Sequence, residues 1–112
     1  MDCVFCEIIN GNIPSTRVYE DEFVIAINDL NPQAPVHMLI IPKKHIECAN
    51  DISAEDTELI GRVFLAAGKI AEKLNLKDGY RIINNCGKNA GQTVMHLHFH
   101  MLAGTNLGEK LV

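Results

Sequence analysis

Apolar and polar residues alternate near the end of the chain, where four apolar residues at odd positions 95–101 are separated by three histidines. A β-strand projects successive side chains to opposite faces, so this pattern predicts a strand. His96, His98 and His100 would line one face, and Met95, Leu97, Phe99 and Met101 the other. Neighbouring imidazoles are costly to bury without partners. The histidine face should therefore meet a site, a metal or water.

Shorter apolar runs predict the remaining strands. Residues 17–19 and 23–28 flank an acidic turn and should form a hairpin. Residues 29–35 contain two prolines and should form a loop, followed by an apolar strand over 36–41 that His37 interrupts and Pro42 closes. After a turn at Asp78-Gly79, residues 80–84 should form a strand and residues 86–92 a glycine-containing loop.

One long helix is predicted after Ser53, a candidate N-cap with Glu55 and Asp56 near the positive end of the helix dipole. Its apolar residues recur at helical spacing and should face the core: Leu59, Ile60, Val63, Phe64, Ala67, Ile70, Ala71 and Leu74. A short helix over residues 3–10 should end at Gly11. Together these elements predict an α+β domain, with about five antiparallel strands, one long helix and a short N-terminal helix.

A chain of 112 residues suits a single domain over 1–112 with one modest core. No apolar run could span a bilayer and no apolar leader is found, so we expect a cytoplasmic protein without a membrane partner. The formal net charge is −4, and no basic run extends beyond Lys43-Lys44, which argues against nucleic-acid binding. A single nucleotide remains compatible, because backbone amides and imidazoles can hold one phosphate.

The four cysteines should be reduced in such a compartment. Cys48 and Cys86 are interpreted as small buried apolar residues. Cys3 and Cys6 form a C-x-x-C pair, which is half a zinc site, with His45 and His96 as candidates for the other ligands. A closed Cys2His2 shell would make the zinc structural. In the alternative interpretation, the two cysteines only cap the first helix.

Three segments resemble the marked segments of the histidine triad family. The stretch 96–102 reads His, apolar, His, apolar, His, apolar, apolar, and residues 28–37 and 40–46 match the other two at the family's spacing. The similarity runs from about Phe5 to Leu102 and is greatest to the Hint-like branch of small nucleoside phosphoramidate hydrolases. The resemblance implies a homodimer with joined sheets, and a zinc ion held by Cys3, Cys6, His45 and His96.

A neutral imidazole can attack phosphorus when its other nitrogen is held by an acceptor, which favours the middle histidine. By resemblance, His98 attacks the α-phosphate and forms a nucleotidyl-histidine, with His37 supporting the triad. If His96 binds zinc, only its backbone carbonyl can orient His98. The remaining family matches are the phosphate-side residues Asn85, Gln92, Thr93 and His100, the ribose residue Asp29, and the base-pocket residues Phe5, Ile8, Ile13 and Ile27.

These residues predict an enzyme that hydrolyses purine nucleoside 5′-phosphoramidates or related adenylates to the nucleoside monophosphate. Thr93 stands where many Hint-like proteins have serine, and the chain lacks the C-terminal tryptophan of animal members, so the leaving group is not fixed. Three alternatives stay open. They are a dinucleoside polyphosphate hydrolase, a non-catalytic protein that binds adenosine or AMP, and a zinc-sensing or structural domain built on Cys3 and Cys6.

Overall fold

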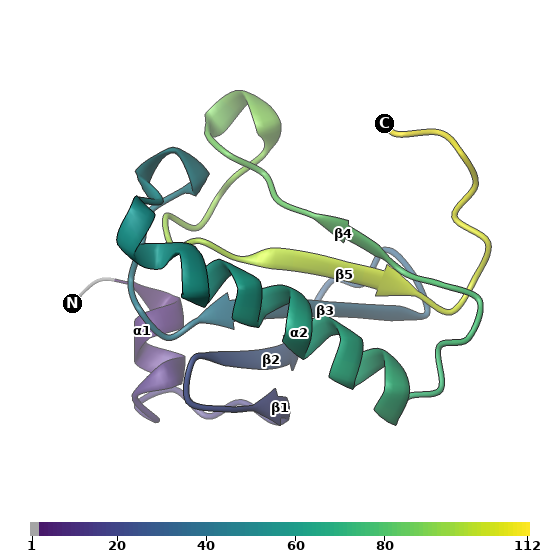
Figure 1. The fold of residues 1–112 in the computed structure, drawn as a ribbon, viewed down its shortest axis with the longest axis horizontal. Helices are drawn as coiled ribbons and strands as arrows, with labels where there is room; N and C mark the ends of the chain where they lie inside the picture. Colours follow the sequence, from purple (N-terminus) through teal and green to yellow (C-terminus); the bar gives the residue numbers. More distant parts are fainter. Residues whose placement is uncertain (1–2) are drawn as a thin grey trace.

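The computed structural model describes residues 3–112 and contains a five-stranded antiparallel sheet in the order β1-β2-β3-β5-β4 (Figure 1). The sheet and the two α-helices confirm the predicted α+β class. The elements are α1 (Val4–Ile9), β1 (Arg17–Glu20), β2 (Val24–Asn28), β3 (Val36–Pro42), α2 (Thr57–Lys73), β4 (Arg81–Ile83) and β5 (Phe99–Ala103). Single turns of 3-10 helix occupy Ala49–Asp51, Ala54–Asp56 and Lys88–Ala90. No helix within residues 3–112 is long and apolar enough to cross a bilayer.

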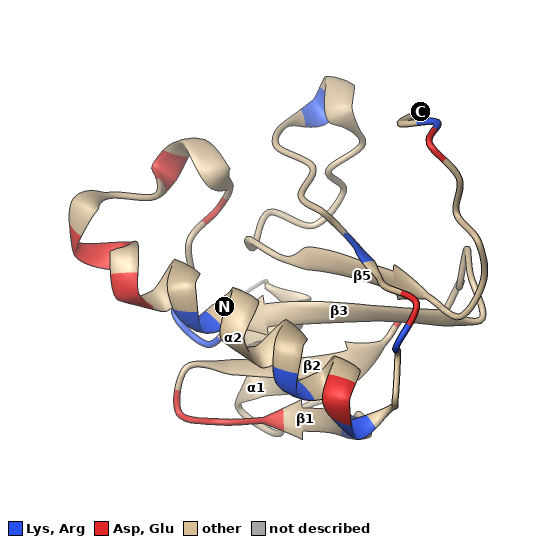
Figure 2. Cartoon of the chain, turned by 45° about the vertical axis from the view of Figure 1, so that its right-hand side comes forward, with Lys and Arg blue, Asp and Glu red and all other residues tan. Residues whose placement is uncertain are grey.

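Strand β3 lies at the centre of the sheet, between β2 and β5. Its register pairs Leu39 with His100 and His37 with Leu102, so His37 and His100 lie on adjacent strands. Neither β3 nor β5 carries a charged residue, and the charges lie on α2, the loops and the outer parts of the sheet (Figure 2). Uncharged central strands suit burial on both faces.

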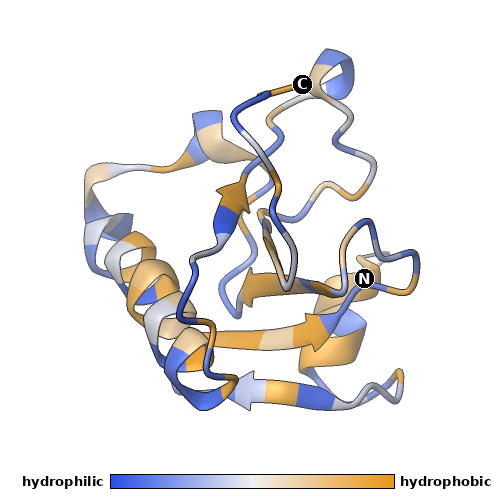
Figure 3. Cartoon of the chain, turned by 90° about the vertical axis from the view of Figure 1, so that its right-hand side faces the viewer, coloured by the Kyte–Doolittle hydropathy of each residue, from blue (hydrophilic) through white to orange (hydrophobic). Residues whose placement is uncertain are grey.

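The alternation of side chains divides the interior into two clusters, and the strands between them are strongly hydrophobic (Figure 3). On one face, residues such as Met38, Phe99 and Met101 pack against the inner side of α2. On the other face, Ile25, Ile27, Leu39 and Ile41 pack against Phe5 and Ile8 of α1. Because His98 and His100 alternate with Phe99 and Met101, they belong to the α1 face.

The histidine strand is shorter than predicted, since β5 begins only at Phe99 and residues 94–96 form a bend. Leu97, Phe99 and Met101 are buried as expected, but Met95 is 46% exposed and does not belong to the apolar face. Alternation requires an extended, pleated backbone, and the bend breaks it before Leu97.

The long helix starts with a 3-10 turn, and Ser53 and Asp56 form a capping box there. Its predicted apolar stripe is only partly right, because Phe64 is 53% exposed and Leu74 is 40% exposed. The buried positions, listed in order, are Leu59, Val63, Ala66, Ala67 and Ile70. At about 100° per residue, Phe64 falls beside this buried face rather than within it, and its ring still contacts that of Phe99 at 6.1 Å between centroids.

Candidate active site and metal site

His98 is buried on the α1 face, immediately before β5. Its Nδ1 lies 2.7 Å from the backbone carbonyl oxygen of His96, which can only accept a hydrogen bond, so Nδ1 carries the proton. The ring of Phe5 packs edge-on at 5.1 Å between centroids. The side chain of Asn84 donates a hydrogen bond of 2.9 Å to the carbonyl oxygen of His98. The imidazole is thereby fixed in orientation, with an unprotonated Nε2.

A chain of hydrogen bonds also fixes the tautomers of His37 and His100. The backbone N–H of Gln33 donates to Nδ1 of His37 at 2.9 Å, so His37 carries its proton on Nε2. That nitrogen lies 2.9 Å from Nδ1 of His100 and donates to it, which leaves the proton of His100 on Nε2. Burial, together with the neighbouring His98 and His37, lowers the pKa of His100 below its ordinary value. His100 is therefore a neutral imidazole that can donate from Nε2.

Asp29 directly follows β2 and lies close to His37 and His100. Its Oδ1 accepts the backbone N–H of Asn31 at 2.8 Å. Its Oδ2 lies 3.4 Å from Nε2 of His37 and 3.9 Å from Nδ1 of His100. The carboxylate therefore lies beside the two histidines and retains acceptor capacity on Oδ2.

Cys3, Cys6, His45 and His96 come together from three separate parts of the chain, with all four ligand atoms within 4.8 Å of one another. The sulfur-to-nitrogen distances are 3.3 Å from Cys3 to His96, 3.3 Å from Cys6 to His45 and 3.6 Å from Cys6 to His96, and the two Nδ1 atoms are 3.1 Å apart. A tetrahedral zinc would separate sulfur from nitrogen by about 3.5 Å and two nitrogens by about 3.3 Å. The donor set fits a tetrahedral ion.

The protonation of His96 and Cys6 also fits a bound metal ion. Nε2 of His96 lies 2.8 Å from the carbonyl oxygen of Pro42 and donates to it, which leaves Nδ1 bare and directed at the cysteines. Burial, and then the adjacent Cys3, raises the pKa of Cys6 to about 11. Without a cation Cys6 is therefore a neutral thiol, and a bound metal would supply the positive charge that a thiolate ligand needs here.

Asp29, His37 and His100 are also close enough to surround an ion, but their protonation argues against one. A metal on Nε2 of His37 would move the ring proton to Nδ1, where the N–H of Gln33 already points. Two donors would then face each other. This group is better described as a hydrogen-bonded relay than as a second metal site.

The loop before β5 contains the predicted phosphate-side residues. Gln92 is buried, and its Oε1 accepts the N–H of Gly87 at 2.9 Å while its Nε2 donates to the carbonyl oxygens of Glu47 at 2.7 Å and Val94 at 3.1 Å. With both amide hydrogens engaged by the backbone, Gln92 holds the shape of the loop and has no donor left for a phosphate. Asn85 is half-buried, and Thr93 is exposed.

The predicted base-pocket residues do not all meet. Phe5, Ile8 and Ile27 belong to the cluster between α1 and the sheet, but Ile13 is 38% exposed outside it. Ile13 follows the glycine turn that ends α1, so the chain has already left the helix surface. The prediction that Cys48 and Cys86 are buried is wrong, because both are partly exposed, and Cys48 donates to Asp51 at 3.3 Å. Both lie in loops rather than in strands.

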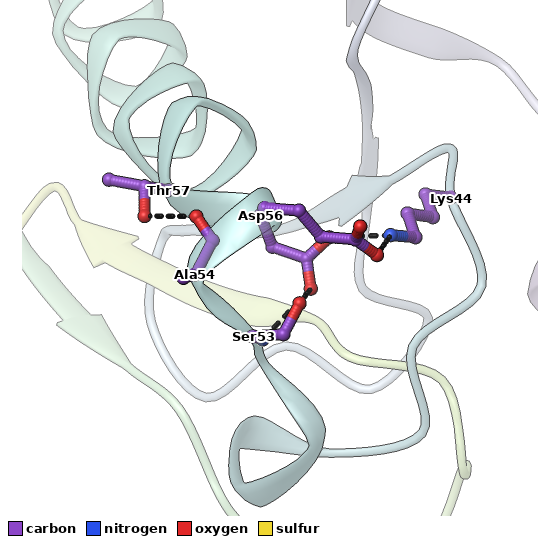
Figure 4. A network of polar contacts seen from close by, with 6 residues as sticks. Lys44, Ser53, Ala54, Asp56 and Thr57 are labelled. Carbon is purple, nitrogen blue, oxygen red and sulfur yellow. Dashed lines mark hydrogen bonds and ion pairs between the residues drawn. The ribbon is translucent and has the colours of Figure 1, made fainter.

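Several supporting residues were not predicted. Asn84 donates from its side chain to a backbone carbonyl, and Gln33 donates from its backbone N–H to His37. No sequence pattern distinguishes these two residues. Lys44, next to His45, reaches from its loop to Oδ1 of Asp56 at 2.6 Å, beside the Ser53 capping box (Figure 4). Only the Ser-x-x-Asp spacing of that cap could have been recognised from sequence.

Comparisons with known proteins cover nearly the whole chain. Residues 10–107 match the family model described as the HIT domain. The chain is 46% identical over 111 residues to the purine nucleoside phosphoramidase of Escherichia coli K12, covering 98% of this chain and 93% of that protein. A histidine triad protein from Clostridium difficile has a TM-score of 0.93 at 49% identity, covering 98% and 96% of the two chains. A HIT family hydrolase from Clostridium thermocellum gives 0.95 at 52% identity, covering 99% and 97%.

Proposed function

This chain belongs to the HIT domain family, and we propose that it hydrolyses purine nucleoside 5′-phosphoramidates or related adenylates to the nucleoside monophosphate. The hydrolase relatives support a nucleotide hydrolase, and the purine nucleoside phosphoramidase of Escherichia coli, at 46% identity, supports the substrate class.

The proposal rests mainly on the orientation of the His98 imidazole. Its Nδ1–H is held by the carbonyl oxygen of His96, so the lone pair of Nε2 is available to a substrate. A nucleophile activated in this way needs no metal at the reacting phosphorus. His96 then acts through its backbone, while its ring faces the cysteines.

The proposed reaction has two steps. Nε2 of His98 attacks the α-phosphorus, the P–N bond breaks, and the leaving amine departs with a proton taken from solvent. Water then attacks the phosphorus of the nucleotidyl-histidine and releases a proton to solvent, the bond between phosphorus and Nε2 breaks, and the nucleoside monophosphate leaves as His98 regains its original state. Nε2–H of His100 is suited to donate to a phosphate oxygen as charge develops, because its tautomer is already set by His37.

The remaining roles follow from position. Asn85 and the backbone N–H groups of Thr93 and Val94 would contact the phosphate, the Thr93 side chain the leaving-group side, and the Oδ2 atom of Asp29 the ribose hydroxyls. Phe5, Ile8 and Ile27 would form the apolar side of the base site. For the metal site we propose a structural zinc, since a closed Cys2His2 set leaves no open coordination position. A cytoplasmic location stays a prediction.

We also propose that the active form is a homodimer. The outer face of α2 presents Phe64 and Leu65, which are 53% and 58% exposed, between Gly61 and Gly68. The space above both glycines is open, so another helix could approach closely. Strand β4 is an edge of the sheet, and an edge offers unpaired backbone groups to a second strand. A second copy of this chain would cover both features.

The decisive test is hydrolysis of adenosine 5′-phosphoramidate by wild type and His98→Asn, with diadenosine polyphosphate as a second substrate. We expect wild type to prefer the phosphoramidate and the variant to lose at least about a thousandfold, as removal of a covalent nucleophile does. Circular dichroism and AMP binding serve as controls for folding. If both proteins bind AMP and neither turns over, the protein is a binding module and the proposal fails.

A further inference from the structure

Two partly exposed cysteines outside the metal cluster lie on loops that the Gln92 side chain joins, although 38 positions separate them in the sequence. Cys48 lies just before the 3-10 turn Ala49–Asp51, and Cys86 lies in the loop after β4. The Cys86 side chain is one of the groups that raise the pKa of the Cys48 thiol. Neither thiol belongs to the metal cluster or to the proposed reaction.

The contact between the two loops is held by Gln92. One end of its amide accepts the N–H of Gly87, the residue after Cys86, and the other end donates to the carbonyl of Glu47, the residue before Cys48. Gln92 is 5% exposed, so this bridge is part of the interior. The two cysteines are therefore brought together by a built connection, and both remain accessible from solvent.

We propose that Cys48 and Cys86 form a reversible disulfide, a modification site that links the loop after β4 to the segment following His45. In compartments where thiols are mostly reduced, disulfides between partly exposed cysteines are usually transient or redox-sensing. The oxidant is a small-molecule disulfide such as oxidised glutathione. One Sγ–Sγ bond forms, the S–S bond of the reagent breaks, and its two sulfurs leave as thiols with the two protons.

The order of the two exchanges follows from Asp51. Its carboxylate accepts the hydrogen bond of the Cys48 thiol and raises the pKa of Cys48, so Cys48 is the less reactive thiol towards an external reagent. Cys86 reacts first and forms the mixed disulfide. Cys48 then displaces the reagent's second sulfur, and its proton leaves by way of Asp51.

The consequence rests on the proposed function. Asn85, a proposed phosphate contact, directly precedes Cys86, so a covalent link fixes the backbone next to it. The loop can then adjust less when substrate binds or product leaves. Oxidation should therefore slow turnover without touching the histidines.

The zinc-loaded protein can be incubated with reduced and oxidised glutathione at several ratios, alkylated, and digested with trypsin without reductant. Trypsin places Cys48 in residues 45–62, Cys86 in residues 82–88, and Cys3 and Cys6 together in residues 1–17. We expect a cross-linked species of 45–62 with 82–88 that rises with the oxidised fraction and disappears with dithiothreitol. Cys48→Ser should abolish it and leave Cys86 only as a glutathione adduct.

The proposal is overturned if the cross-linked species is absent at every ratio while the two thiols become glutathionylated separately. Turnover of adenosine 5′-phosphoramidate should fall at least about fivefold in the oxidised wild type and stay constant in Cys48→Ser treated alike. A cross-link with unchanged turnover would overturn the effect on the loop. Absence of hydrolysis before oxidation would instead contradict the proposed function, because the mass measurement does not depend on activity.

Discussion

The ring nitrogen that carries the proton determines which hydrogen bonds each histidine of this protein can donate or accept. The carbonyl of His96 and the N–H of Gln33 are backbone groups with one possible role each, and they set the tautomers of His98 and His37. His100 then follows from His37. Three imidazoles in one site are thus distinguished by their neighbours: His98 has an unprotonated Nε2, His37 relays a hydrogen bond, and His100 can donate from Nε2.

The lowered pKa of His100 predicts an acid-sensitive fold. Its pKa lies below 6.5 mainly because burial disfavours the charged ring, and the pKa of His96 is lowered for the same reason. Between the lowered pKa of each folded histidine and pH 6.5, the unfolded chain binds more protons than the folded chain. The contribution of these two histidines to the free energy of unfolding is therefore complete above pH 6.5 and is lost as the pH falls. We expect the urea midpoint to decrease from pH 7 to pH 5.

The matched variant is His100→Gln, which removes one of the two groups and should give a shallower decrease over the same range. The carboxyl groups with lowered pKa values, such as Asp21 and Glu20, titrate below this window and do not interfere. A midpoint that is constant or rises on acidification would contradict the assignment of neutral, buried rings.

Sequence patterns point to the candidate chemical residues more readily than to the residues that position them. The alternation around His98 and the C-x-x-C spacing carry a signal, and the structure brings Cys3, Cys6, His45 and His96 together. The role of Asn84 depends on a backbone carbonyl 14 positions away, which no local pattern encodes. The same holds for Gln92, whose side chain bonds to three backbone groups in different segments.

At the scale of elements, the candidate metal site joins three segments that lie outside the strands. It connects the cap of α1 to the loop after β3 and to the bend before β5. We expect about one zinc per purified chain, and a loss of zinc in Cys6→Ala with a lower melting temperature, because metal binding contributes directly to folding. Cys86→Ala replaces a cysteine outside the cluster and should keep the metal.

Metal analysis of the two variants, with thermal unfolding before and after a chelator, checks this prediction. Equal zinc in wild type and Cys6→Ala would remove the cluster as the binding site. An unchanged melting temperature after complete removal of zinc would show that the ion has no structural role.

The start of α2 depends on a carboxylate that is nearly buried. Asp56 is 4% exposed, accepts the N–H and hydroxyl of Ser53, and pairs with Lys44 at 2.6 Å. We expect Asp56→Asn to lower the melting temperature by about 4–6 °C, as the loss of a helix cap does in a domain of this size. Glu55→Gln is the control, because Glu55 is 78% exposed and 3.4 Å from the same lysine.

A shift of similar size in both variants would mean that charge near Lys44, rather than the cap, stabilises this turn. Thermal unfolding at neutral pH distinguishes the two cases. The sequence spacing indicates the Ser-x-x-Asp cap. It does not indicate the partner of Asp56, because Lys44 lies on the loop beyond β3.

For the whole molecule, the outer face of α2 explains why the helix prediction was partly wrong. Helical periodicity counts every apolar residue as core, and it cannot separate an inward stripe from an outward one on the same helix. Phe64 and Leu65 are exposed beside two glycines with open space above them. These are the features of a surface that a partner covers.

If a second copy covers it, Phe64→Glu should dissociate the dimer, because a carboxylate would be buried between two helices. Sedimentation velocity at micromolar concentration should give the mass of two chains for wild type and of one chain for the variant. Leu111→Glu, at an 86% exposed position outside α2, is the control and should remain dimeric. A wild type with the mass of one chain would contradict the proposal.

The central position of β3 has a consequence for how the protein is made. Its partner β5 is the last of the described strands, and His96, a candidate metal ligand, lies just before it. A ribosome adding roughly 5–20 residues per second needs about 3–12 s to go from the end of β3 to the end of β5. During that interval the apolar strand β3 has no β5 beside it, and His96 is not yet available to the site of Cys3 and Cys6. The sheet and the metal site therefore close together, late in synthesis, and chaperones have a defined period in which to protect β3.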